Sequence, residues 1–323
     1  MFIKHLCYTA SMKSNIAVDV GSSNMRAASF LPGSSNPIHS NRVETRSEGM
    51  SVEDRLLNLV ETVIPEDYPP ASIGVASPGP VDPINGIVIE PPAIPEWRYF
   101  PLQEFLENHF SVPVRINTDA NLAALGEWSF GAGKGYSNLI YVAVSTGIGG
   151  GIIVDNSLLR GSCGFSNEIG HLMVDPDGPK CTCGIHGHLE ALSSGPAMVR
   201  WVKAQLNDDK IDSLFQDEKL NPKDLEDAAL SGNQLAAAAY ERSGRFLGIA
   251  ISDLIHIFNP EIVIIGGGIS NAGELLLKPI RESVSKHLIS AAYLDNLVIS
   301  QAELGDKSGL LGALTLARET NPA

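Results

Sequence analysis

Short apolar runs alternate with amphipathic segments along the chain, and this alternation predicts a mixed α/β protein. Runs of roughly four to eight apolar residues bounded by glycine or polar residues are typical of buried strands. Such runs cover residues 15–20, 25–30, 72–76, 112–117, 138–144 and 261–265. Apolar residues at helical spacing predict helices over residues 51–64, 101–110, 119–130, 232–258 and 308–317.

One arrangement, a strand followed by a glycine turn and a second strand, occurs in both halves of the chain. The first copy covers residues 15–30, and the second starts with the strand 138–144 and the sequence STGIGGGI. This repeat predicts two similar α/β lobes around a cleft. We expect an N-terminal lobe of residues 1–118, joined by a C-terminal helix at 305–323, and a C-terminal lobe of residues 119–304. The polar segment 207–223 is expected to be an exposed connection or a small helical insert.

Composition and charge narrow the range of partners. A length of 323 residues accommodates two lobes, and the net charge of -14 argues against a general nucleic-acid or anionic-membrane binder. No apolar run approaches the length of a membrane span, and the N-terminus does not resemble a signal peptide. Met12 is a plausible true start. The four cysteines, without a secretory context, favour a reduced cytoplasmic protein.

The segment from His171 to Glu190 has the spacing H-x9-C-x-C-x4-H, formed by His171, Cys181, Cys183 and His188. Thiolate and imidazole ligands together suit tetrahedral zinc, and four protein ligands leave no open position, so a structural role is expected. Because the segment is rich in glycine and poor in apolar residues, we expect the metal to be what orders it. Glu168 and Glu190 lie just outside the ligand set and could accept hydrogen bonds from hydroxyl groups.

Three glycine loops follow apolar strands, at residues 19–24, 145–151 and 265–270. Glycine lets a backbone approach a phosphate closely, and backbone N–H groups supply donors without Lys or Arg. The alternative is that each loop is only a tight turn. None matches a Walker A loop or the dinucleotide fingerprint. If the loops hold a nucleotide, Val at Gly147 or Gly267 should weaken binding of the nucleotide more than binding of the second substrate.

Asp119 stands where a predicted strand meets a predicted helix. Its position alone favours a helix N-cap, for which Asp is a preferred residue. Phosphoryl transfer depends mostly on positioning and charge stabilisation, so an Asp at this place could also orient an acceptor hydroxyl and take its proton. Glu127, in the same helix, is expected to be solvated or paired with another helical residue.

The chain resembles the bacterial sugar kinases of the repressor–open-reading-frame–kinase (ROK) family, the glucokinase-like branch of the actin/hexokinase fold. The matching motifs span nearly the whole chain, and EIGH with the metal segment is the most specific part. In chain order they are DVGSSN (19–24), SPGPVDPING (77–86), TDANLAALGE (118–127), STGIGGGI (145–152), GFSNEIGH (164–171), CTCGIHGHLE (181–190) and IIGGGIS (264–270).

This resemblance implies two ribonuclease-H-like lobes and a set of site residues. Asp119 would be the catalytic base. The sugar would contact Gly79, Thr118, Glu168, His171 and Glu190, with His171 also a zinc ligand. ATP phosphates and Mg²⁺ would be held by Asp19, Gly21, Ser22, Ser23, Asn24, Thr146 and Gly147, and adenosine by the loop at 266–268, including Gly267 and Gly268.

Three departures from the family pattern affect the site. Thr118 replaces the family's Asn before the catalytic Asp, and His188 replaces the third zinc cysteine. Phe165, Ser166 and Asn167 stand where relatives carry small residues, so the pocket wall differs.

The implied activity is ATP-dependent, Mg²⁺-requiring phosphorylation of a hexose, with glucose converted to glucose 6-phosphate. The alternatives are an N-acetylmannosamine or N-acetylglucosamine kinase, or a non-catalytic sugar-sensing relative. The family's repressors carry a DNA-binding domain before this core. Only fourteen residues precede the first predicted strand here, so a repressor and a nucleic-acid partner are not expected. A homodimer or homotetramer is expected, as is usual in the family.

Overall fold

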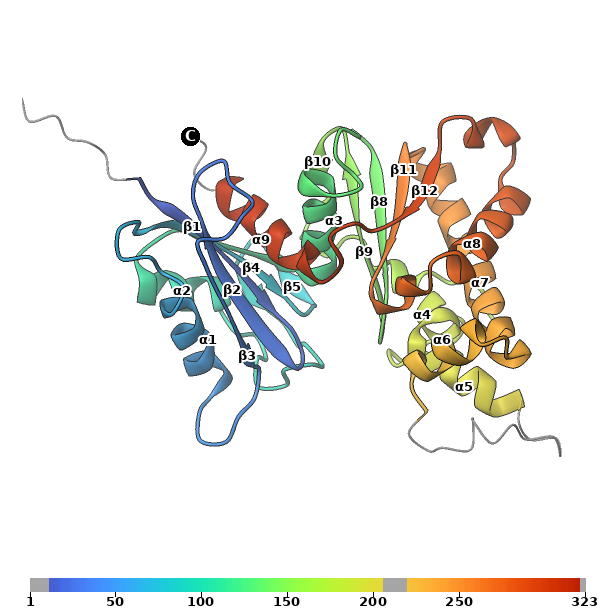
Figure 1. The fold of residues 1–323 in the computed structure, drawn as a ribbon, viewed down its shortest axis with the longest axis horizontal. Coiled ribbons are helices and arrows are strands. Elements are labelled where there is room, and N and C mark those ends of the chain that lie inside the picture. Colours follow the sequence, from blue (N-terminus) through green and yellow to red (C-terminus); the bar gives the residue numbers. More distant parts are fainter. Residues whose placement is uncertain (1–11, 206–219, 320–323) are drawn as a thin grey trace, which may run out of the picture. The chain divides into compact units, whose positions relative to one another are not determined.

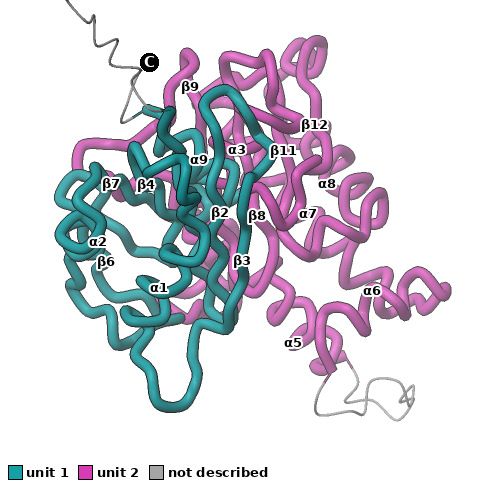
Figure 2. Tube along the Cα trace, turned by 60° about the vertical axis from the view of Figure 1, so that its left-hand side comes forward, with its two compact units in different colours: residues 1–122, 309–323 teal, residues 123–308 magenta. Residues whose placement is uncertain are grey.

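The computed structural model describes residues 12–205 and 220–319, and the chain divides into two compact units (Figure 2). Unit 1 consists of residues 1–122 and 309–323, and unit 2 of residues 123–308. The sequence-based boundaries at 118 and 304 fall four residues earlier in each case. The first boundary differs because α3 (Asp119–Phe130) is one continuous helix whose first four residues belong to unit 1.

Unit 1 is built on a sheet with the order β3-β2-β1-β4-β7 among the described residues (Figure 1). β1 pairs antiparallel with β2 and parallel with β4, which pairs parallel with β7. The strands are β1 (Ser14–Val20), β2 (Asn24–Phe30), β3 (His39–Glu44), β4 (Pro70–Ser77) and β7 (Val114–Thr118), with a separate small ribbon of β5 (Val81–Asp82) and β6 (Ile87–Val88). The helices are α1 (Val52–Glu61), α2 (Leu102–Phe110) and α9 (Ser308–Glu319).

Unit 2 repeats this arrangement with the order β10-β9-β8-β11-β12 among the described residues. β8 pairs antiparallel with β9 and parallel with β11, which pairs parallel with β12. The strands are β8 (Leu139–Val144), β9 (Ile148–Val154), β10 (Ser157–Leu158), β11 (Ile262–Gly266) and β12 (Val298–Gln301). The two sheets have the same order and the same strand directions, so the predicted duplication of an α/β lobe is confirmed.

The two faces of the unit 1 sheet are covered differently because side chains alternate along each strand. Ile16, Val18 and Val20 of β1 lie in one core cluster with Leu56 of α1 and Leu102 of α2. The opposite face lies against α9. A Cβ on Gly74 of β4 would collide with the backbone of α9 at residues 313 and 317, so only glycine permits this approach of helix to strand.

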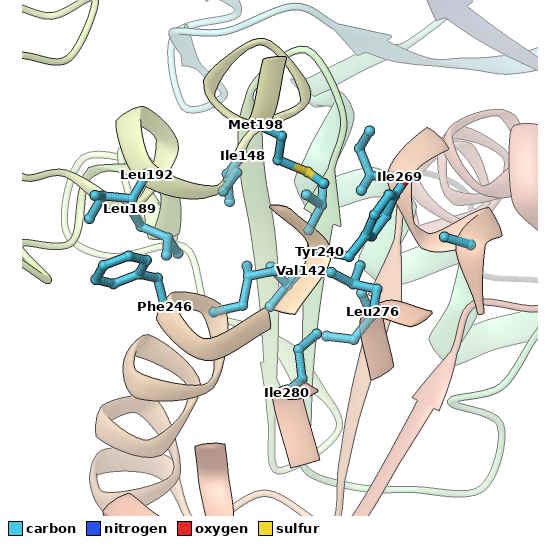
Figure 3. Close-up of a cluster of buried hydrophobic side chains, with 14 of the residues drawn as sticks. Val142, Ile148, Leu189, Leu192, Met198, Tyr240, Phe246, Ile269, Leu276 and Ile280 are labelled. Carbon is cyan, nitrogen blue, oxygen red and sulfur yellow. The ribbon is translucent and has the colours of Figure 1, made fainter. Parts of the chain in front are cut away.

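The core of unit 2 is formed where helices pack on its sheet (Figure 3). Val142 of β8, Leu276 and Ile280 of α8, and Tyr240 of α7 belong to this cluster. Burial raises the pKa of the Tyr240 phenol above its usual range. The unit 2 helices are α4 (Leu189–Ser193), α5 (Gly195–Gln205), α6 (Pro222–Leu230), α7 (Gln234–Phe258) and α8 (Glu274–His287), with 3-10 turns η1 (Ile169–His171), η3 (Gly268–Ala272), η4 (Ala291–Leu294) and η5 (Gly305–Lys307).

Each predicted strand and helix is present, with ends that differ by a few residues. Of the predicted polar connection 207–223, residues 207–219 lie outside the described residues, and Pro222 begins α6 behind the N-cap Asn221. The sequence pattern did not predict the helices α4, α5 and α8 or the strands β3, β5, β6, β10 and β12. In α8 the cause is Pro279, which normally argues against a helix interior. No helix in residues 12–205 and 220–319 is long and apolar enough to cross a membrane.

The prediction that Glu127 is solvated or paired with another helical side chain is wrong. Glu127 has 0% of its surface exposed, and its carboxylate accepts three backbone N–H bonds. The donors are Ala132 at 2.9 Å, Glu303 at 3.2 Å and Leu304 at 2.8 Å. The carboxylate therefore joins the end of α3 to the segment that leads into α9, and both lie in the part of unit 2 next to its boundaries.

Glu127→Ala is expected to destabilise the fold by about 3 kcal/mol or more, because it leaves three backbone donors without their acceptor. Urea unfolding of wild type and variant measures the difference. The control is Ser129→Ala, which shortens another polar side chain of α3 without removing a carboxylate. Equal losses for both substitutions would contradict the role assigned to Glu127.

Candidate active site

The predicted site residues of unit 1 gather at one edge of its sheet. β1, β4 and β7 are parallel, and their paired positions at this edge are Asp19 with Ala76 and Ser77 with Thr118. Asp19 lies near the end of β1, and Asp119 directly follows β7. The carboxyl edge of parallel strands is where α/β proteins bind ligands. The topology thus gives the predicted residues of unit 1 a common location.

The turn between β1 and β2 is fixed by backbone hydrogen bonds. The N–H of Gly21 donates to the Asn24 carbonyl oxygen at 2.9 Å. Thr45, which follows β3, also bonds to this turn. Its hydroxyl donates to the Gly21 carbonyl oxygen at 2.7 Å, and its N–H donates to the Ser23 carbonyl oxygen at 2.9 Å. Ser22 and Ser23 are exposed at the tip. The alternative of a tight turn therefore describes the backbone correctly, and contact with a phosphate stays a prediction.

Asp119 is exposed at the first position of α3, and it is not the residue that caps this helix. The Asn121 N–H donates to Thr118 Oγ1 at 3.3 Å, which places the hydroxyl of Thr118 at the cap. The Asp119 carboxylate accepts from the neighbouring Ala120 N–H at 2.7 Å. The N-cap interpretation weighed for Asp119 thus belongs to Thr118. Gly79 lies beside this cap, since a Cβ on it would be 3.3 Å from Thr118 Cγ2.

Two glycine loops of unit 2 lie next to each other at the carboxyl edge of β8 and β11. These strands are parallel neighbours, with Gly266 opposite Ala143. A Cβ on Gly267 would collide with the backbone of Val144, and Gly267 has φ +81°. Gly268 is exposed, and a Cβ there would meet Ser145 Oγ only at 4.0 Å. The loops 145–147 and 266–268 therefore lie next to each other, with Thr146, Gly267 and Gly268 exposed.

Gly147 is required by a neighbouring carboxylate. A Cβ on Gly147 would lie 2.6 Å from Glu190 Oε2, and the same oxygen accepts the Ile148 N–H at 3.0 Å. Val at Gly147 or Gly267 is therefore a poor probe of nucleotide binding. Val at Gly147 would displace Glu190, and Val at Gly267 would meet the β8 backbone at a positive φ. Neither can separate effects on ATP from effects on the sugar.

Gly150 of β9 and Gly170 of η1 allow the segment that carries Glu168 and His171 to lie against β9. A Cβ on Gly150 would collide with the side chain of Ile169, and one on Gly170 with the carbonyl oxygen of Ile148. The short helix η1 therefore lies directly on β9. Glu168 precedes it and is exposed, and its carbonyl oxygen accepts the His171 N–H at 3.0 Å. Gly150, predicted only as part of a phosphate loop, thus also positions this segment.

Phe165, Ser166 and Asn167, which differ from the family pattern, do not have the same kind of environment. The side chains of Ser166 and Asn167 both donate to the Leu159 carbonyl oxygen, at 2.6 and 2.8 Å. Asn167 adopts φ +71°, which asparagine tolerates better than most residues. Phe165 has 53% of its surface exposed. Ser166 and Asn167 therefore fix the loop before Glu168, while Phe165 adds an apolar side chain to its surface.

The structure brings the four predicted metal ligands together, and among the described residues they form one group able to hold a metal. Their ligand atoms all lie within 4.8 Å of one another. The two histidine Nδ1 atoms are 3.3 Å apart, Cys183 Sγ is 3.2 Å from His188 Nδ1, and Cys181 Sγ is 3.9 Å from His171 Nδ1. Tetrahedral zinc has N···N edges of about 3.3 Å and N···S edges of about 3.6 Å. The donor set and spacing therefore fit zinc.

Backbone hydrogen bonds also run through this segment, and the expectation that a metal orders it stays a prediction. The Cys181 N–H donates to the Ile185 carbonyl at 2.8 Å, and the Gly184 N–H donates back to Cys181 at 2.9 Å. The Gly187 N–H donates to Pro179 at 3.0 Å. Burial raises the pKa of the Cys181 thiol. Residues 179–187 thus form a hydrogen-bonded turn, which we call the metal turn.

Two contacts in this region could not be predicted from the sequence. Glu190 Oε1 accepts from the hydroxyl of Thr182 at 3.2 Å, and Glu190 Oε2 accepts from the Ile148 backbone. Thr182 stands between the two cysteines, which is the one signal that could have drawn attention to it. His186 is exposed, with its Nδ1 3.1 Å from the Gly178 carbonyl oxygen.

The sequence is similar to those of two glucokinases over most of their length. A glucokinase from Streptomyces coelicolor is 35% identical over 314 residues, which covers 95% of this chain and 98% of that protein. A glucokinase from Thermotoga maritima is 37% identical over 275 residues, covering 83% of this chain and 86% of that protein.

A solved structure extends the similarity to the fold. It is that of a ROK family glucokinase from Streptomyces griseus in complex with glucose and AMPPNP. The match has a TM-score of 0.81 at 34% identity and covers 95% of this chain and 99% of the other. Residues 15–320 also match the model of the ROK family. The resemblance seen in the sequence motifs is therefore confirmed, and the chain belongs to the ROK family.

Proposed function

We propose that this protein phosphorylates glucose to glucose 6-phosphate with ATP and Mg²⁺. The observation that carries this proposal is the match, over 95% of the chain, to a glucokinase structure with glucose and AMPPNP bound. The relatives at 35% and 37% identity are glucokinases as well. An N-acetylmannosamine or N-acetylglucosamine kinase, or a non-catalytic sugar sensor, is the competing function within the same family.

We assign Asp119 the role of catalytic base. Its exposed carboxylate at the carboxyl edge of β7 supports this role, as does the cap formed by Thr118, which gives the capping of α3 to another residue. In this role Asp119 orients the 6-hydroxyl of glucose and accepts its proton as the phosphoryl group is transferred. Positioning and charge stabilisation account for most of such a reaction, so a weak base is sufficient.

We assign the remaining sugar contacts to Glu168, His171 and Glu190 in unit 2 and to Gly79 and Thr118 in unit 1. The support for Glu190 is its fixed carboxylate, which keeps acceptor capacity after the bonds from the Ile148 N–H and the Thr182 hydroxyl. Carboxylates that accept hydrogen bonds from sugar hydroxyls can discriminate between sugars, because an analogue lacking a hydroxyl leaves a buried acceptor unpaired.

We assign the nucleotide to the exposed glycine loops. In this assignment the adenosine is bound by Gly267 and Gly268. The phosphates and Mg²⁺ are bound by Asp19, Gly21, Ser22, Ser23, Asn24, Thr146 and Gly147. Mg²⁺ supplies charge neutralisation at the phosphates when it is bound. Zinc, held by four protein ligands, would act structurally by fixing the turn next to Glu190.

Gly268→Ala is expected to raise the KM for ATP roughly fivefold or more, while the KM for glucose stays within about twofold. A methyl group fits at this position, since its nearest neighbour would be Ser145 Oγ at 4.0 Å, and it would enter the surface assigned to the nucleotide. Steady-state kinetics with each substrate varied measures both constants. A rise in the KM for glucose alone would show that this loop serves the other ligand.

A coupled assay with a panel of sugars tests the function itself. With ATP and Mg²⁺ we expect glucose to give the highest kcat/KM, followed by other hexoses. A higher value for N-acetylmannosamine or N-acetylglucosamine would overturn glucose as the substrate. Sugar binding without phosphorylation of any sugar would favour the sensor.

We further propose a homodimer or homotetramer in the cytoplasm that does not bind nucleic acid. The net charge of -14 supports the absence of a nucleic-acid partner. Sedimentation velocity measures the assembly, and a monomer at micromolar concentration would contradict it.

A further inference from the structure

Two segments of the chain hydrogen-bond to the Glu190 carboxylate: one is assigned to the ATP phosphates, and the other is the metal turn. One oxygen, Oε2, accepts the Ile148 N–H at 3.0 Å, directly after the glycine loop assigned to the phosphates. The other, Oε1, accepts the hydroxyl of Thr182 at 3.2 Å, inside the metal turn. Because the two bonds engage different oxygens, they fix both the position and the plane of the carboxylate.

The two bonds leave room for a substrate. A carboxylate offers about four lone-pair sites on its two oxygens. The bonds from Ile148 and Thr182 use one on each oxygen, and Cys181 Sγ makes a further weak contact with Oε1 at 3.9 Å, so each oxygen keeps capacity for a hydroxyl donor. Glu190 is partly exposed, which keeps those sites accessible. The same carboxylate can thus be held in place by the protein and accept hydrogen bonds from a sugar.

Thr182 is the side chain of the metal turn that makes this connection at hydrogen-bonding distance. Cys181 Sγ also approaches Glu190 Oε1, but at 3.9 Å, which is near the limit for a weak sulfur donor. Thr182 is not a member of the four-residue metal group. Its position between two ligands means that a metal in the turn would fix its backbone on both sides.

We propose that Thr182 is a positioning residue for the sugar, acting through Glu190. When the metal turn is ordered, the Thr182 hydroxyl holds the Glu190 carboxylate in the orientation that accepts sugar hydroxyls. This inference rests on the proposed function of Glu190 as a sugar contact. It goes further by assigning the coupling between the metal turn and the sugar to one hydroxyl group.

The contact at Ile148 has a second consequence. The Ile148 N–H and the close approach of Gly147 connect the same carboxylate to the phosphate loop. A displaced Glu190 should therefore affect sugar binding first and ATP binding less, since the loop keeps its own backbone bond between the Ser145 N–H and the Gly147 carbonyl at 2.9 Å. The effect of Thr182 is thus expected to be selective for the sugar.

The test compares Thr182→Val with Thr182→Ser. Valine keeps the branched shape but removes the hydroxyl, while serine keeps the hydroxyl. Direct glucose binding by titration calorimetry, steady-state kinetics and zinc content are measured on each purified full-length protein. We expect Thr182→Val to raise the Kd and KM for glucose about three- to tenfold, with the KM for ATP, kcat and zinc content little changed. Thr182→Ser should stay within about twofold of wild type.

A control in the same turn is Ile185→Val, which trims an exposed side chain and keeps the backbone bond to Cys181. It should leave glucose binding unchanged. Unchanged glucose binding in Thr182→Val, an equal loss in Thr182→Ser, or loss of zinc in Thr182→Val would each overturn the proposal. These outcomes are judged against a wild type that binds and phosphorylates glucose. A wild type that does neither would instead refute the proposed function.

Discussion

Asp119→Asn is expected to lower kcat for glucose phosphorylation by roughly two or more orders of magnitude. The amide has nearly the shape of the carboxylate but cannot accept the proton of the acceptor hydroxyl at neutral pH. It also removes the negative charge that orients that hydroxyl. Glucose affinity should change much less, because the other sugar contacts are assigned to Glu168, His171 and Glu190. Rapid-quench measurements of phosphoryl transfer and calorimetric glucose binding separate the two effects.

The structure supplies a control for this experiment. Thr118, whose hydroxyl accepts the Asn121 N–H, forms the cap of α3, so Asp119→Asn should leave the helix and the Tm almost unchanged. Thr118→Val removes the cap and should cost about 1 kcal/mol of stability. Near-normal kcat in Asp119→Asn would show that this carboxylate has no catalytic role.

His188→Ala is expected to lose zinc and to raise the KM for glucose by roughly tenfold or more. His188 is nearly buried, with 6% of its surface exposed, and stands two residues before Glu190 at the start of α4. Losing one of four ligands strongly lowers the affinity for zinc. Without zinc the metal turn loosens and no longer holds the Glu190 carboxylate in place. The core cluster of unit 2 contains no residue of the metal turn, so the rest of the fold should be retained. Elemental analysis and glucose titration measure both effects.

His188→Cys is the matched variant, since it restores the family's usual ligand set. It should keep about one zinc per chain and near-normal activity. Wild-type protein that contains no zinc and is fully active would refute a structural zinc site here. Zinc-free His188→Ala with unchanged glucose binding would instead separate the metal from Glu190.

Much of the fold followed from local sequence patterns. The strand–glycine turn–strand repeat predicted two similar sheets, because each copy carries its own apolar runs and turn. The metal ligands could be found because ligand type and spacing are both visible in the sequence. Helix α8 could not, since Pro279 argues against a helix unless its packing is known. In the structure Gly244 of α7 leaves space for this proline: a Cβ on Gly244 would lie 2.6 Å from Pro279 Cγ.

The contacts missed from the sequence join residues that are far apart in the chain. From the sequence alone, Glu127 looks like a surface residue of α3. Two of its backbone donors, Glu303 and Leu304, are 176 and 177 residues away in the chain, so the sequence pattern cannot reveal them. Gly147 has the pattern of a phosphate-loop glycine, yet the group nearest to it is the carboxylate of Glu190. Local patterns identify residue types and turns, while partners of a buried carboxylate depend on the tertiary fold.

The most direct test of the proposed function is identification of the product by ³¹P NMR. Wild-type protein is incubated with glucose, ATP and Mg²⁺, with Asp119→Asn as the matched control. The account predicts stoichiometric conversion of ATP to ADP and glucose 6-phosphate by the wild type, and only a trace of this product with the variant over the same time. Absence of glucose 6-phosphate in the wild-type reaction, or equal amounts from both proteins, would contradict it.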